Sequence, residues 1–178
     1  MTELARRAVL RHFRGESGHA DVWRIFADAE ALRLVVGGLA APWTDTDVTR
    51  VVGVESRGFL LGGACALTLG VGFVPIRKDG GLLPGPKVST RSEQDYRGHR
   101  HRLRVQRVLT VGDRVLLVDE WVERGGQARA AAELVEACGA VFLGVSVIVD
   151  QLVEESRTAL RRVTSLVRAD ELGDPNTL

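Results

Sequence analysis

Apolar positions along the chain follow two different periods, which predicts helices alternating with strands. Helical spacing appears at Leu32, Val35, Val36 and Leu39, and again over residues 126–138, where Ala and Leu form one stripe. Short apolar runs, several of them β-branched, predict strands at 50–54, 71–76, 103–109, 114–118 and 140–149. The pattern favours an α/β fold: a central parallel sheet covered by helices on both faces, with ligands at the carboxyl ends of its strands.

One strand-to-helix connection carries candidate chemistry. The apolar run 115–118 leads into Asp119 and Glu120, and Gly125 and Gly126 then open the Ala-rich helix. Carboxylates at the edge of a parallel sheet can bind hydroxyl groups, and glycines allow backbone amides to approach a phosphate at a helix N-terminus. Turns of this composition also occur in α/β domains that bind nothing. A phosphorylated sugar is therefore the ligand that this connection predicts if it is a site.

A second connection repeats the plan. Val51 and Val52 lead into Gly53, and the turn ahead of the predicted helix 60–69 carries Ser56, Arg57 and Gly58. A hydroxyl, a guanidinium and a flexible backbone together can hold an anionic group. Two such turns suggest one ligand with phosphates at both ends, although Arg57 could instead cap its turn.

Composition agrees with a single-domain enzyme over residues 1–178. The chain is 45% hydrophobic with a net charge of +1, and no linker or low-complexity tract divides it. No apolar stretch reaches membrane-spanning length, and residues 1–13 lack the apolar middle of a secretory signal, so a cytoplasmic location is expected. Cys65 and Cys138 are expected to be buried thiols rather than a disulfide, and the histidine spacing predicts no metal centre built by the protein.

Six runs of the chain, taken in order, carry a resemblance to a known family: 27–32, 53–59, 67–78, 83–85, 112–119 and 125–126. They resemble the type I phosphoribosyltransferases, and most closely the adenine phosphoribosyltransferase group. Together they span most of residues 27–149, and a weaker echo at 157–167 resembles the closing strand of that family. The resemblance implies transfer of a phosphoribosyl group from phosphoribosyl pyrophosphate to a purine or purine-like base, with magnesium pyrophosphate leaving.

The resemblance also implies roles for individual residues. Asp119 and Glu120 would contact the ribose hydroxyls, while Ser56 and Arg57 would meet the pyrophosphate; Asp119, Glu120 and Arg57 are the expected catalytic residues. Magnesium would arrive with the ligand, held mainly by the ligand's own oxygens and by water. The 5-phosphate would be cradled by the loop of Glu123, Arg124, Gly125, Gly126, Gln127 and Ala128.

Two further expectations concern the ends of the site. By resemblance, Arg77 and Lys78 would approach the pyrophosphate of a neighbouring subunit, which implies a homodimer; as an alternative, they form a solvated strand end. Val22 and Trp23 fall where the family builds a hood over the base, within residues 1–27 together with an N-terminal helix. Trp23 could stack on the base or pack in the core.

The chain departs from the family pattern in two places. Arg124 and Gln127 replace two threonines of the phosphate loop, so a guanidinium and an amide stand where small hydroxyls are usual. The segment 97–107 is strongly basic where the family carries a tyrosine and glutamates, which puts a preference for ordinary adenine in doubt. We expect residues 77–107 to contain a flexible lid whose candidate functional residues are Tyr96, His99, His101, Arg102 and Arg104.

The basic segment admits three interpretations: a lid that grips an anionic ligand, an electrostatic patch for nucleic acid, or a solvated strand that needs no partner. The small net charge and the absence of interleaved aromatic residues make nucleic acid the least favoured. Two function classes follow for the whole chain. It is either a phosphoribosyltransferase or a non-catalytic relative that binds phosphoribosyl pyrophosphate or a nucleotide as a sensor or regulator.

Overall fold

A five-stranded parallel sheet forms the centre of the molecule. The structure is a computed structural model that describes residues 2–16, 19–94, 98 and 100–172. The strands lie in the order β4, β3, β7, β8, β9, and every neighbouring pair is parallel, which confirms the predicted fold class. Their bounds are β3 Arg50–Val54, β4 Gly72–Ile76, β7 Arg114–Val122, β8 Val141–Asp150 and β9 Val163–Arg168.

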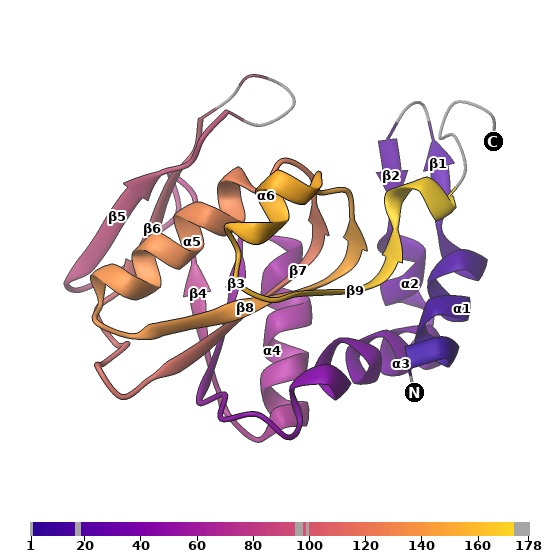
Figure 1. Ribbon diagram of the computed structural model, residues 1–178, viewed down its shortest axis with the longest axis horizontal. Coiled ribbons are helices and arrows are strands. Elements are labelled where there is room, and N and C mark those ends of the chain that lie inside the picture. The colour runs from indigo at the N-terminus through magenta and orange to yellow at the C-terminus, as the bar shows by residue number, and fades with distance from the viewer. Residues whose placement is uncertain (1, 17–18, 95–97, 99, 173–178) are drawn as a thin grey trace.

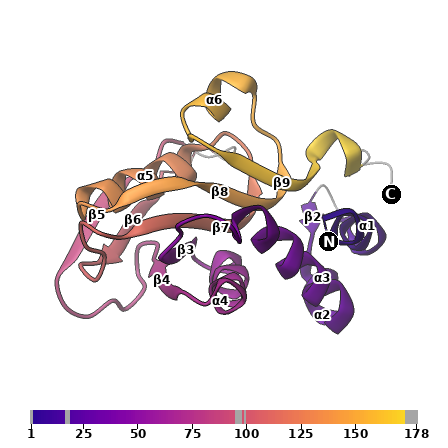
Figure 2. The ribbon, with the colours of Figure 1, turned by 60° about the horizontal axis from the view of Figure 1, so that its bottom comes forward.

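Side chains of alternate residues in the sheet pack into two separate hydrophobic cores, one on each face. Leu116 and Val118 of β7 belong to the core shared with helices α3 (Ala29–Ala40) and α4 (Arg57–Leu69). Val115 and Leu117 belong to the core on the other side, which includes the apolar stripe of α5 (Gly126–Ala137). Figure 2 shows the sheet between α4 and α5. Burial on both faces explains why these strands read as continuous apolar runs.

The N-terminal elements gather at one end of the molecule (Figure 1). Helix α1 (Thr2–His12) packs on α3 and on β9, and it is followed by the hairpin of β1 (Arg14–Glu16) with β2 (His19–Asp21) and by helix α2 (Trp23–Ala27). Asp28 begins α3 as a side-chain cap, because its carboxylate accepts a hydrogen bond from the Ala31 amide at 2.8 Å. A short 3₁₀ turn, η1 (Ala41–Trp43), closes this region.

The strand predicted at 103–109 does not join the parallel sheet, and that expectation was wrong. It is β6 (Arg102–Gln106), which pairs antiparallel with β5 (Lys87–Arg91) in a hairpin that packs against α5. Two backbone hydrogen bonds of 2.9 Å between Arg77 and Arg104 tie the hairpin to the end of β4. An alternating pattern shows that a strand has one buried face but not which sheet it enters.

Two other predicted bounds need correction. β7 continues past residue 118 to Val122, because Trp121 and Val122 still pair with β8, so Asp119 and Glu120 lie within the strand rather than after it. The segment 157–167 is not a single strand: helix α6 (Glu154–Thr158) covers its start, and β9 begins only at Val163. The chain then closes with the 3₁₀ turn η2 (Ala169–Leu172).

Both cysteines are free, with Cys65 buried and Cys138 half-buried, and burial raises the pKa of the Cys65 thiol to about 12.

Within the part of the chain that the structure describes, no helix is long and apolar enough to cross a membrane. The same residues contain no cluster of three or more His, Cys, Asp or Glu side chains that could hold a metal ion.

Candidate functional site

The carboxyl half of β7 places two acids side by side in the middle of the sheet. Asp119 accepts a hydrogen bond from the Glu120 amide at 2.9 Å, so the carboxylate of Asp119 is held close to its own strand. Burial, reinforced by the adjacent carboxylate of Glu120, raises the pKa of Asp119 well above its usual value. A strongly perturbed acid at the end of a parallel strand is typical of a functional site.

The turn between β3 and α4 lies directly against these acids. A side chain at Gly53 would come within 2.0 Å of the Gly58 carbonyl oxygen, so only glycine fits there, and one at Gly58 would press against the Asp119 carboxylate at 3.0 Å. Ser56 is the N-cap residue of α4, and its side chain makes no capping hydrogen bond. The peptide bond between Glu55 and Ser56 is cis. The two turns predicted separately from sequence therefore meet at one place.

Arg57 connects the acids to the N-terminal elements. Its Nη2 lies 2.7 Å from Glu120 Oε1, and its guanidinium carbon lies 5.8 Å from the centre of the Trp23 ring. Trp23 is 52% exposed, which excludes the core-packing alternative for this side chain. Its edge meets Phe26 at a centroid distance of 5.5 Å, and the neighbouring Val22 is buried. Carboxylates, guanidinium and an exposed aromatic face thus stand in one row.

The glycine turn after β7 forms the N-terminus of α5. Gly125 has φ +79° and is the N-cap residue of the helix, in the left-handed conformation that glycine adopts without strain. Gly126 and Ala128 are buried, Gln127 is half-buried and the side chain of Arg124 is exposed. Because Arg124 is exposed, its side chain does not fill the phosphate loop. Glu123, also half-buried, has an interaction partner in the structure.

The basic pair at the end of β4 is held within its own chain. Arg77 makes two hydrogen bonds to the carboxylate of Glu55, at 2.8 and 3.2 Å, and a third to the carbonyl oxygen of Leu82 at 3.1 Å. The Lys78 amide donates to the same Glu55 carboxylate at 3.0 Å. The Arg77 guanidinium lowers the pKa of Glu55. Arg77 is therefore an anchored side chain and not the solvated strand end considered above.

Comparison with known proteins decides the family. No family model matches the chain. An adenine phosphoribosyltransferase of Methylococcus capsulatus is 41% identical over 149 residues, covering 83% of this chain and 86% of that protein. One from Nocardioides sp. is 43% identical over 147 residues, covering 80% and 78%. The chain belongs to the adenine phosphoribosyltransferase family. The predicted family and enzyme class, a phosphoribosyltransferase among the glycosyltransferases, are confirmed.

Solved structures of the family have the same fold. The adenine phosphoribosyltransferase of Giardia lamblia, solved with 9-deazaadenine, is 34% identical with a TM-score of 0.77, covering 84% of this chain and 86% of that one. The enzyme of Thermoanaerobacter pseudethanolicus is 27% identical with a TM-score of 0.82, covering 92% and 99%. The residue roles inferred from the family in this chain stay predictions, and the structure adds how those residues are arranged.

Three of the candidate lid residues, His101, Arg102 and Arg104, lie in or beside the β5–β6 hairpin. Tyr96 and His99 fall outside the described residues. His101 donates its backbone amide to Ser92 Oγ at 3.0 Å, and the Arg102 side chain is exposed. Arg104 points inward and donates to the carbonyl oxygens of Lys78 and Gly81 at 3.1 and 2.8 Å. Of the three interpretations of the basic segment, the solvated strand describes Arg102, whereas Arg104 fastens the base of the hairpin to the end of β4.

Three residues of the site were missed by sequence reasoning. Glu55 holds Arg77 and Lys78, and Glu93 of the hairpin region forms a bidentate ion pair with Arg129 in the first turn of α5. The Ala and Leu stripe over residues 126–138 leaves Arg129 on the outer face of its helix, which gives no reason to assign it a role from sequence. Glu55 directly precedes Ser56, a candidate site residue, so its position in the sequence could have indicated a role in the site. The pairing of Glu93 with Arg129 joins residues far apart in sequence and had no local signal.

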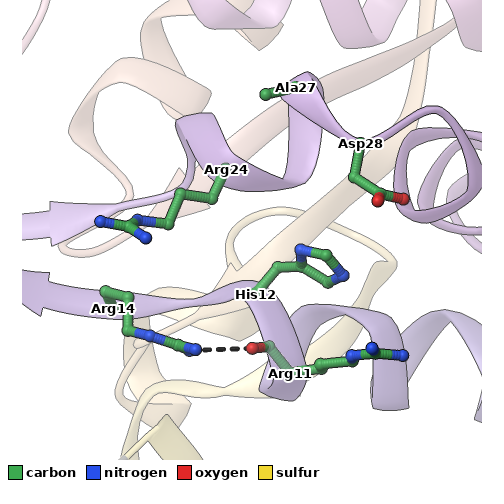
Figure 3. Close-up of a pocket in the computed structure, with 6 residues that line it drawn as sticks. All are labelled: Arg11, His12, Arg14, Arg24, Ala27 and Asp28. Atoms are coloured by element: carbon green, nitrogen blue, oxygen red, sulfur yellow. Dashed lines mark hydrogen bonds between the residues drawn. The ribbon is translucent and has the colours of Figure 1, made fainter.

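A basic hollow of about 360 Å³ lies apart from these residues, among the N-terminal elements (Figure 3). The Arg14 guanidinium turns to the main chain there and donates to the carbonyl oxygens of Arg11 and Phe13 at 2.8 and 2.6 Å. Arg24 forms an ion pair of 3.3 Å with Asp21. The hollow is lined by Arg11, His12, Arg14, Arg24, Ala27 and Asp28, so it marks the junction of α1, β1 and α2 and contains none of the predicted site residues.

Proposed function

We propose that the protein transfers the 5-phosphoribosyl group of phosphoribosyl pyrophosphate to a purine base, with adenine as the acceptor, and releases pyrophosphate. The observation that carries this proposal is the row formed by Asp119 and Glu120, Arg57 and exposed Trp23. It offers acceptors for sugar hydroxyls, a cation for a phosphorylated leaving group and an aromatic face for a base within one site. The relatives support adenine, because they are adenine phosphoribosyltransferases and the Giardia protein was solved with 9-deazaadenine.

The residues of the chain would act mainly by position and electrostatics. Asp119 and Glu120 accept hydrogen bonds from the ribose hydroxyls, which orients the anomeric carbon between the base and the leaving group. Arg57, fixed by Glu120, faces the negative charge that develops on the departing pyrophosphate. Trp23 stacks on the base from the other side. The amides of the 125–128 turn and the positive end of α5 bind the 5-phosphate.

Magnesium fits this site as a companion of the substrate. The ligand's own oxygens and water would supply the oxygen donors that Mg²⁺ prefers, and Asp119 and Glu120 would hold the ribose beside the ion. When bound, the ion would neutralise charge on the pyrophosphate as it leaves. The described residues contain no larger cluster of acids and histidines that could form a separate metal centre.

A homodimer is part of the proposal. Leu60 and Leu67 of α4 are 51% and 85% exposed, and Gly63 between them has open space where a side chain would be. This apolar face lies on the helix that begins with Arg57, and a second copy of the chain would remove it from water. The N-terminal elements over residues 1–27 would serve as the hood of each site. A cytoplasmic location stays a prediction.

A panel of bases tests the proposed function. The purified protein is incubated with phosphoribosyl pyrophosphate, magnesium and either adenine, hypoxanthine, guanine or a pyrimidine, and pyrophosphate release is measured. We expect release that depends on adenine and is lost in the double variant with Asp119→Asn and Glu120→Gln. Binding of phosphoribosyl pyrophosphate without release for any base would favour the sensor. No rise in melting temperature with millimolar ligand would contradict both.

A further inference from the structure

The N-terminus of α5 has an unusual donor beside it. The family's two loop threonines are replaced by Arg124 and Gln127, and Arg124 is exposed to solvent. Arg129, one turn into α5, instead folds back over the glycines. Its Nη1 lies 2.8 Å from the position that a Cβ atom would take at Gly125, and its Nη2 donates to the Arg124 carbonyl oxygen at 3.1 Å. A guanidinium therefore stands over the turn that lacks hydroxyls.

A carboxylate occupies the same place. Glu93 leaves the β5–β6 hairpin just after β5, and its Cβ lies 3.1 Å from the position of a Cβ atom at Gly126. Its Oε2 and Oε1 accept hydrogen bonds from Arg129 Nη2 at 2.5 Å and Nε at 3.3 Å. Figure 1 shows the hairpin alongside α5. An anionic group already rests beside the glycine turn, paired with the nearest guanidinium.

This arrangement suits an exchange of anions. A carboxylate and a phosphate both form bidentate contacts with a guanidinium, and a phosphate carries more charge and more acceptor oxygens. The Glu93 side chain is 66% exposed and that of Arg129 only 24% exposed, so the carboxylate can move into water while the guanidinium stays at the turn. Because one partner of this ion pair is largely in solvent, the pair contributes little stability and a stronger anion can displace the carboxylate.

We propose that Arg129 is a binding residue for the 5-phosphate of phosphoribosyl pyrophosphate, and that Glu93 holds its guanidinium in the ligand-free protein and is displaced by that phosphate. The inference rests on the proposed function, since it deepens the role of the same turn. Arg129 supplies the charged donor that replaces the missing threonine hydroxyls. Glu93 joins the hairpin to this turn through Arg129, so a phosphate that takes the place of the Glu93 carboxylate breaks that connection.

Titration calorimetry with phosphoribosyl pyrophosphate and magnesium tests both residues. Arg129→Met removes a charge-assisted contact, and we expect its Kd to rise about 10- to 100-fold. Arg129→Lys keeps the charge without the bidentate geometry, so its Kd should lie between those of the wild type and Arg129→Met. Glu93→Gln removes the competitor, so its Kd should fall about two- to fivefold. In the double variant, Glu93→Gln should have no effect on the Kd, because its action requires Arg129.

Glu133→Gln is the matched control. Glu133 also joins α5 to the hairpin, by accepting a hydrogen bond from Thr90 Oγ1 at 2.9 Å, but it lies one turn further from the phosphate loop. Its removal should leave the Kd unchanged. Ribose 5-phosphate, which has the phosphate without the pyrophosphate, serves as a second probe and should show the same order of variants.

The outcomes separate this inference from the proposed function. An Arg129→Met protein that folds with the wild-type melting temperature and binds phosphoribosyl pyrophosphate as tightly as the wild type would overturn the inference, and so would a Glu93→Gln protein that binds it more weakly. Neither result would contradict the proposed phosphoribosyltransferase activity of the wild type. If the affinity for phosphoribosyl pyrophosphate depends on Arg129 but none of the tested bases causes release of pyrophosphate, the inference is supported and the proposed enzymatic function is contradicted.

Discussion

Arg57 Nη2 lies 2.7 Å from Glu120 Oε1, and this contact joins the first residue of α4 to the middle of β7. The pair is largely shielded, with the Glu120 side chain 13% exposed. It fixes a guanidinium between the acids and the Trp23 ring. The contact brings the two strand-to-helix connections into a single site.

Removing the Arg57 guanidinium should damage catalysis more than folding. Arg57→Met leaves Glu120 unpaired and takes away the cation that faces the leaving group, so we expect kcat/KM to fall about 100- to 1,000-fold. Arg57→Lys, which keeps the charge, should recover part of the loss. Steady-state kinetics with adenine checks this. A kcat/KM for Arg57→Met within threefold of the wild type would show that the side chain only connects the two elements.

Trp23→Ala should act on the base and not on the sugar phosphate. Loss of an exposed stacking face should raise the KM for adenine about tenfold, whereas the Kd for phosphoribosyl pyrophosphate should stay unchanged. Trp23→Phe is the matched variant and should keep most of the affinity. If the KM for adenine and the Kd for phosphoribosyl pyrophosphate rise by the same factor, the substitution disturbs α2 as a whole.

Asp119→Asn should stabilise the protein at neutral pH while weakening its ligand binding. Because the folded pKa of Asp119 is raised above its unfolded value, ionising this group costs stability at high pH and costs nothing at low pH. The variant should therefore have the higher melting temperature above the raised pKa. The difference should shrink as the pH falls towards the ordinary pKa of aspartate and vanish below it. Unfolding curves of the wild type and the variant at several pH values test this.

Glu55→Gln should have the opposite dependence on pH. The folded pKa of Glu55 is lowered by Arg77, so its contribution to stability is fully present above the ordinary pKa of glutamate and is lost as the pH falls through the lowered value. The variant should melt below the wild type at neutral pH, with the gap closing in acid. Glu3→Gln, which breaks an exposed ion pair with Arg7, should cause a smaller drop. A gap that widens in acid would contradict the assignment.

A charge on the exposed face of α4 should prevent dimer formation. Leu67→Glu places a carboxylate in the middle of the proposed apolar interface, where burying it without a partner is unfavourable. We expect light scattering after size exclusion to give a dimer for the wild type and a monomer for the variant. Leu4→Glu, at a leucine that is 54% exposed on α1, should remain dimeric. If the wild-type protein is monomeric at high concentration, the proposed dimer interface is contradicted.

The sequence by itself determined the central sheet and the two turns that are candidates for ligand binding. Apolar runs buried on two faces, followed by glycines and small residues, are local signals, because a strand between two helical layers and a tight turn each require particular residues at particular positions. The order of those signals also identified the family. Asp119, Glu120, Arg57 and the Gly125–Gly126 turn are therefore recognisable as candidates from the sequence alone.

Only the tertiary structure decided which distant residues meet. The pairing of β6 with β5, the contact of Arg77 with Glu55 and the closure of Glu93 on Arg129 all join segments separated by turns or by whole elements. The exposure of Trp23 was likewise settled by how α2 packs. Such contacts depend on how helices and hairpins pack around the sheet, and a one-dimensional pattern of hydrophobicity specifies which face of an element is buried but not what covers it.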